Sequence, residues 1–190
     1  MERKIARVNP NHREVVLKCF NSEMKTLLRT LISLAVIVWL GGLLFFPIVA
    51  AVSFTHLPDT HAAGSVVGAS LRILHQEGLF AGALLVLLFV AASVSGLYPR
   101  QVLRPPLVMV VVMLLLTAYS QFSIIPRMEN YRLAAGGIID AVPRSDPNRA
   151  GFDRLHNQST RVEEGVMIAG LLLVLLLARA ESTEFRYSGR

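Results

Sequence analysis

The sequence has a single cysteine among its 190 residues, so it forms neither an intrachain disulfide nor a paired-cysteine metal site. A reactive thiolate at Cys19 also has no support, because no second cysteine accompanies it and His12 is seven residues away. Walker-type phosphate loops, serine elbows and helical His-Glu-x-x-His motifs are absent, as are nucleic-acid-binding motifs. We therefore expect a protein that is not an enzyme and does not bind nucleic acid.

Charged residues are missing from four long stretches of the chain. Apolar residues make up 53% of the sequence and gather in these runs rather than being scattered. The first run continues for 24 residues from Leu31, which is enough for a helix to cross a hydrocarbon core of roughly 30 Å. This pattern predicts one all-α domain, residues 30–179, that forms a four-helix transmembrane bundle in a lipid bilayer. The expected spans are residues 30–54, 78–98, 105–125 and 160–179.

Polar segments flank and connect the spans. Residues 1–29 are basic, and Met24 opens a stretch that is typical of the start of a membrane protein. Residues 1–23 therefore belong either to the protein or to an over-extended start. The tail, residues 180–190, is polar, and we expect it to be unstructured. Residues 133–151 contain paired glycines and two prolines, which predicts a flexible connector.

The last span is too short when only its apolar residues are counted. Gly165 to Ala178 is 14 residues, about 21 Å of helix, against a hydrocarbon core of roughly 30 Å. The turns before it are polar and contain no breaker, so we expect a polar extra-membrane helix to extend the span. Spacings of three and four residues place four polar side chains on one face of this helix. They are His156, Ser159, Thr160 and Glu163.

Basic residues set the expected orientation in the membrane. The net charge is +6, with 12 Lys and Arg on the side of the termini and 7 on the opposite side. The positive-inside rule then makes both termini cytoplasmic, in what we expect to be a bacterial inner membrane. If Met24 is the start, the two sides tie at 7, and the orientation depends on the short basic turn between the second and third spans.

With the termini inside, polar residues gather at the outer ends of the spans. They are His75 before the second span, Gln121 and Arg127 around the end of the third, and His156 and Glu163 on the fourth. One interpretation is a hydrogen-bonded cap that pairs Glu163 with Arg127. Another is a pocket for a small-molecule or metal ligand, and a third is a metal or haem site with His75 and His156 as ligands. Ionisable groups at such depth usually face a bundle interior or a wet cavity, so this set is the candidate site.

Several short motifs resemble the membrane family known as domain of unknown function 4149. They are Gly41-Gly42 to Phe46-Pro47, Gln121 to Pro126-Arg127, and Phe152, His156 and Arg161 to Gly165. They are also similar to the related transmembrane protein 205 of eukaryotes, and the likeness covers roughly residues 24–178. The resemblance implies a four-span integral membrane protein. The eukaryotic relative is associated with resistance to a platinum drug, which implies export or trafficking.

More distantly, the architecture is similar to copper-resistance D proteins and to a four-helix, haem-containing protoporphyrinogen oxidase, which use membrane histidines. Here the histidines sit at span ends or outside the spans, and no predicted span carries one at its middle. We therefore expect no cofactor and a protein that binds or exports a metal or small cation through the outer polar residues. A haem- or copper-binding redox protein, with His75 and His156 as ligands, and a structural or assembly subunit are the alternatives.

Overall fold

The computed structural model describes the backbone of residues 10–188 and the side chains of residues 21–182. Every regular element in this part of the chain is helical. The elements are α1 (Pro10–His56), α2 (Thr60–Val94), α3 (Arg100–Tyr119), the π-helix η1 (Ser120–Ile124), α4 (Ile125–Ala134), the 3-10 turn η2 (Ile139–Ala141) and α5 (Pro147–Ser188).

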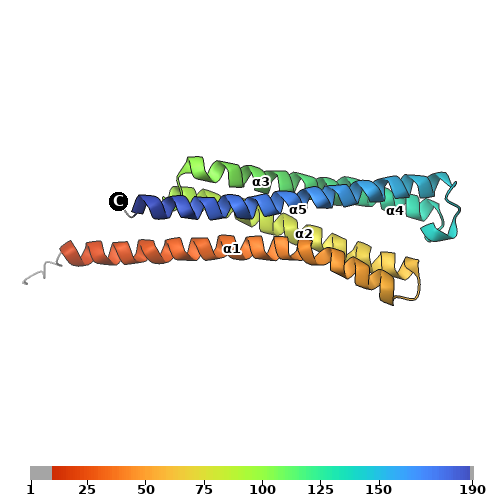
Figure 1. Cartoon of the computed structure of the whole chain (residues 1–190), viewed down its shortest axis with the longest axis horizontal. Coiled ribbons are helices and arrows are strands. Elements are labelled where there is room, and N and C mark those ends of the chain that lie inside the picture. Colours follow the sequence, from red (N-terminus) through yellow and green to blue (C-terminus); the bar gives the residue numbers. More distant parts are fainter. Residues whose placement is uncertain (1–9, 189–190) are drawn as a thin grey trace, which may run out of the picture.

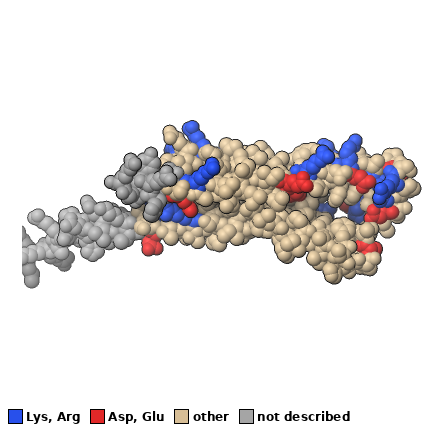
Figure 2. All heavy atoms as spheres, viewed as in Figure 1, with Lys and Arg blue, Asp and Glu red and all other residues tan. Residues whose placement is uncertain are grey.

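Four helical segments are long and apolar enough to cross a membrane: Asn21–His56, Thr60–Val94, Arg100–Ala134 and Pro147–Ser182. On the face shown in Figure 2, the charged side chains lie toward the two ends of the molecule and the middle is uncharged. The prediction of an all-α transmembrane bundle is thereby confirmed, and the chain is an integral membrane protein.

The long helices run along the long axis of the molecule (Figure 1), and their contacts arrange them in a ring. α1 packs mainly on α2, α2 on α3, and α3 on α5, and contacts between α1 and α5 close the ring. α1 and α3 are therefore diagonal partners, as are α2 and α5. The links after α1 and α2 are short, so consecutive helices run antiparallel. α1 contains Pro47 and bends in its last third (Figure 1), as expected for a proline inside a helix.

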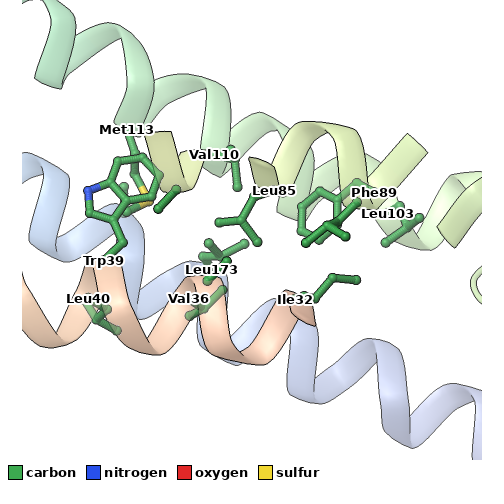
Figure 3. Close-up of a cluster of buried hydrophobic side chains, with 14 of the residues drawn as sticks. Ile32, Val36, Trp39, Leu40, Leu85, Phe89, Leu103, Val110, Met113 and Leu173 are labelled. Carbon is green, nitrogen blue, oxygen red and sulfur yellow. The ribbon is translucent and has the colours of Figure 1, made fainter. Parts of the chain in front are cut away.

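The core is densest where the single tryptophan meets α2. Trp39 is 1% exposed and lies against Gly78 and Gly82. A Cβ atom on Gly78 would overlap the indole nitrogen, and one on Gly82 would come within 2.8 Å of the indole ring. Figure 3 shows Trp39 and Met113 at one end of a layer of apolar side chains from α1, α2, α3 and α5. Small residues here let the helices approach closely.

The helices extend beyond two of the predicted segments. The second span is expected from residue 78, and the helix that contains it, α2, begins earlier, at Thr60, where the Asp59 side chain accepts a hydrogen bond from the Ala62 N–H at 2.6 Å. The tail expected to be unstructured is helical as far as Ser188. Residues 1–9 and the side chains before Asn21 lie outside the described part, so the interpretation of residues 1–23 stays a prediction.

The connector between α4 and α5 is hydrogen-bonded rather than a free linker. The Arg149 guanidinium donates to the Val142 carbonyl at 2.8 Å, and Arg132 donates to the Gly137 carbonyl at 2.8 Å. Asp146 caps α5 by accepting from the backbone N–H of Asn148 at 2.7 Å. The turns that the sequence predicted are present, and these bonds fix their shape.

Candidate functional site

His75 is the centre of a buried polar cluster. Its side chain is 1% exposed, and it lies near the midpoint of α2. Nδ1 is 3.0 Å from the Gln121 side-chain oxygen, and Nε2 is 2.6 Å from Glu163 Oε1. These three residues, here called the His75 cluster, join α2, η1 and α5. Because α2 and α5 are diagonal in the ring, the His75–Glu163 contact crosses the bundle interior.

Both ring nitrogens of His75 face oxygen atoms. An imidazole that donates at both nitrogens is an imidazolium, which complements the charge of the Glu163 carboxylate. When His75 is neutral, only one ring nitrogen carries a proton, so one of its two partners must donate a hydrogen bond to the other nitrogen. Either the Gln121 amide is rotated so that its NH2 group faces Nδ1, or the Glu163 carboxyl group is protonated. The cluster therefore has several hydrogen-bonded arrangements that differ in the number of its protons or in the atom that holds one.

Further buried oxygen atoms lie in α3, η1 and α5. Glu163 Oε2, Thr117 Oγ1 and Ser120 Oγ are buried and have no hydrogen-bond partner among the described residues. Thr117 is 2% exposed and Ser120 is fully buried. Buried polar atoms without partners are rare in folded proteins and carry a free-energy cost. Glu163 Oε2 belongs to the His75 cluster itself, Ser120 adjoins Gln121 in sequence and Thr117 lies one helical turn before Gln121, and each of these oxygens can accept a hydrogen bond or ligate a hard cation.

A π-helical turn carries Gln121. The N–H of Ile125 donates to the carbonyl of Ser120, five residues earlier, in place of the usual four. Pro126 follows directly and has no N–H to donate, so the regular α-helical ladder is interrupted here. π-turns are rare and are often found at functional sites. In this protein the turn lies where Gln121 meets His75.

The structure brings together three of the five predicted site residues and leaves two apart. Arg127 is exposed, and among the described residues no ion pair joins it to Glu163. The cap that we expected to pair Glu163 with Arg127 is replaced by the contact with His75. His156 is also exposed, and its ring stacks on Phe152 with 6.2 Å between the ring centroids.

The buried face of α5 explains why His156 is left out. Leu155 and Ser159 are buried, whereas His156 and Thr160 point outward, so the predicted polar face is divided between interior and surface. The Thr160 hydroxyl donates to the backbone carbonyl of His156 at 3.1 Å. His75 and His156, the ligand pair expected for a metal or haem, are therefore not neighbours. Within the described residues no group of three or more His, Cys, Asp or Glu side chains is arranged to hold a metal ion.

The early start of α2 places His75 inside a long helix. The sequence placed this residue just before a span, and in the structure it lies near the midpoint of α2, one of the four helices that are long and apolar enough to cross a membrane. The contact with Glu163 had no sequence signal, because 88 positions separate the two residues. Only the packing of α2, α3 and α5 reveals it.

A model of the family described as domain of unknown function DUF4149 matches residues 34–136, which is more than half of the chain. The chain belongs to this family. The DUF4149 match includes His75 and Gln121 and ends before Glu163, so it covers two of the three residues in the cluster. It confirms the family that the sequence motifs indicated. Comparison with curated proteins and with solved structures gives no match.

Proposed function

We propose that this DUF4149 protein moves a small cation across the membrane and that the His75 cluster binds this cation. The contacts of His75 carry the proposal, because both of its ring nitrogens face oxygens and a proton can reside at more than one atom. A proton is therefore the cation that the geometry favours. Ionisable side chains inside a membrane are costly, and they commonly mark proton relays and ion pathways.

The free acceptors narrow the range of other cations. The atoms without partners are a carboxylate oxygen and two hydroxyl oxygens, which suit hard cations better than soft ones such as Cu(I). Export of a metal or small cation, as the likeness to transmembrane protein 205 implies, would then use these oxygens. The proposal also places the protein in a bacterial inner membrane with cytoplasmic termini, in accord with the excess of basic residues on that side.

The test is a proton-uptake assay on purified protein in liposomes that enclose a pH-sensitive dye. Valinomycin and a potassium gradient supply the membrane potential. We expect uptake by the wild type, and a fall to the rate of protein-free liposomes in Glu163→Gln and in His75→Asn, because each change removes one proton-holding atom. Glu164→Gln and His156→Asn are the matched controls, since these residues are exposed on α5, and they should keep the wild-type rate.

Two results would count against the proposal. Wild-type uptake equal to that of protein-free liposomes, for protons and for other small cations, would exclude transport. Equal proton uptake by the wild type and Glu163→Gln would show that transport does not use the His75 cluster. Metal analysis and an absorption spectrum of the same preparation test the cofactor alternatives. A bound metal or a Soret band that disappears in His75→Ala/His156→Ala would favour a metal or haem site.

A further inference from the structure

A groove opens between α1 and α2 on the face turned away from α3 and α5. Its volume is about 210 Å³, and its walls are mainly apolar and aromatic, with Phe45, Phe46 and Ile73 among them. Phe45 and Ile73 are 59% and 64% exposed, so the groove faces the lipid side of the bundle. Gly42 also lines the groove, and the Leu74 side chain lies 2.7 Å from the point where a Cβ atom on Gly42 would be, so Leu74 fills that space.

One carboxylate stands in this apolar groove. Glu77 lines it, and its two oxygens lie 3.5 and 3.8 Å from the point where a Cβ atom on Gly42 would be. Among the described residues, the Glu77 carboxylate has no hydrogen bond and no ion pair. The neighbouring cation Arg72 is instead within 3.7 Å of Glu129, and His75 points into the bundle.

Glu77 is also deep in the membrane. It lies at the midpoint of α2, and Gly42 lies at the midpoint of the uncharged run from Leu31 to Phe54. Each end of that run is about 17 Å away along the helix, which is more than half the thickness of a hydrocarbon core. A carboxylate at this depth is costly unless a cation accompanies it. Among the described residues no cation lies within ion-pair distance of Glu77, so its charge is available to a cation from outside the chain.

We propose that the groove binds a small amphipathic organic cation, with its ammonium group at Glu77 and its apolar part against Phe45 and Phe46. The carboxylate supplies charge complementarity, and the phenyl rings supply apolar and cation–π contacts. The volume is below the roughly 300–1,000 Å³ of sites for drug-sized ligands, so the ligand is a small aromatic or alkyl ammonium. A lipid headgroup ammonium does not fit, because headgroups lie outside the hydrocarbon core.

The experiment measures saturable binding of radiolabelled benzyltrimethylammonium to the full-length protein in detergent. No membrane gradient is needed, so the result does not depend on transport or on the His75 cluster. We expect Glu77→Gln to raise the dissociation constant about tenfold, because it removes the charge and keeps the side-chain volume. Ser70→Phe should abolish binding, because Ser70 lines the groove and the larger ring fills it. Tetramethylammonium, which lacks the apolar part, should compete poorly.

Glu164→Gln is the matched control, because Glu164 is an exposed carboxylate outside the groove, and it should bind as the wild type does. Fluorescence of the single tryptophan, Trp39, reports whether each variant keeps its fold, since this residue is buried beside Gly78. Absence of saturable binding by the wild type up to about 1 mM would overturn the proposal. An unchanged dissociation constant in Glu77→Gln would also overturn it. Loss of binding in Glu163→Gln alone would move the ammonium site to the His75 cluster.

Discussion

A single side chain, His75, connects three helices of the bundle. Its contacts with Gln121 and Glu163 satisfy both ring nitrogens in a place that is 1% exposed to solvent. Burying such a pair is costly in itself, so the pair adds little net stability compared with apolar residues of the same size. Removing only one partner is different, because the remaining carboxylate stays buried without a donor.

We therefore predict that His75→Ala lowers the free energy of unfolding by about 3 kcal/mol. His156→Ala should change it by less than about 0.5 kcal/mol, because His156 is exposed and meets Phe152 at the surface. Denaturant-induced unfolding in mixed micelles measures both. The double variant His75→Leu/Glu163→Leu should be less destabilised than His75→Ala, since it leaves no unpaired charge. Equal stability of the two single alanine variants would show that the cluster does not hold the helices together.

At the scale of elements, α1 and α2 are joined through two glycines and one indole. Gly78 and Gly82 are one helical turn apart and leave the space that Trp39 occupies. Glycine is a poor helix former, about 1 kcal/mol worse than alanine per residue. Its presence at the centre of a 35-residue helix therefore points to a packing requirement rather than to local flexibility.

Gly78→Ala is expected to destabilise the protein by about 1–3 kcal/mol, because the added methyl group overlaps the Trp39 ring. Gly68→Ala is the control on the same helix, with no atom within 4 Å of the added carbon, and it should be neutral or slightly stabilising. Thermal unfolding followed by Trp39 emission measures both variants. If Gly68→Ala were the more harmful of the two, close packing of α1 on α2 would not be the reason for the glycine.

The elements themselves were largely predictable, whereas their ends and contacts were not. Uncharged runs such as the one from Leu31 predict helices because apolar side chains leave water. The polar residues before residue 78, Arg72 among them, were the reason for expecting the second span to begin there, whereas α2 is one continuous helix from Thr60 and Arg72 lies within 3.7 Å of Glu129. The residues of the His75 cluster were identified, but the pairing was not, since helical periodicity says which face a residue is on and not which helix lies opposite.

For the whole molecule, charge separates into two ends with a sparse layer between them. Figure 2 shows this layer as an uncharged band on the visible face. Of the groups inside the bundle or its groove, His75 and Glu163 pair with each other, whereas Glu77 stands alone among the described residues. The two proposals together assign two kinds of cation site to one architecture: a closed site for a proton and an open one for an organic ammonium.

The orientation of this architecture gives the last prediction. The only native cysteine can be removed by Cys19→Ser, and two exposed serines then provide a matched pair for labelling: Ser145 in the connector before α5 and Ser182 near its end. α5 crosses the membrane between them, and the excess of basic residues puts the end with Ser182 in the cytoplasm. In spheroplasts, a membrane-impermeant maleimide should label Ser145→Cys and leave Ser182→Cys unlabelled until the membrane is permeabilised. The reverse labelling pattern would show that the bundle has the opposite orientation, with the connector before α5 inside the cell. Labelling of both positions in intact spheroplasts would contradict a crossing by α5.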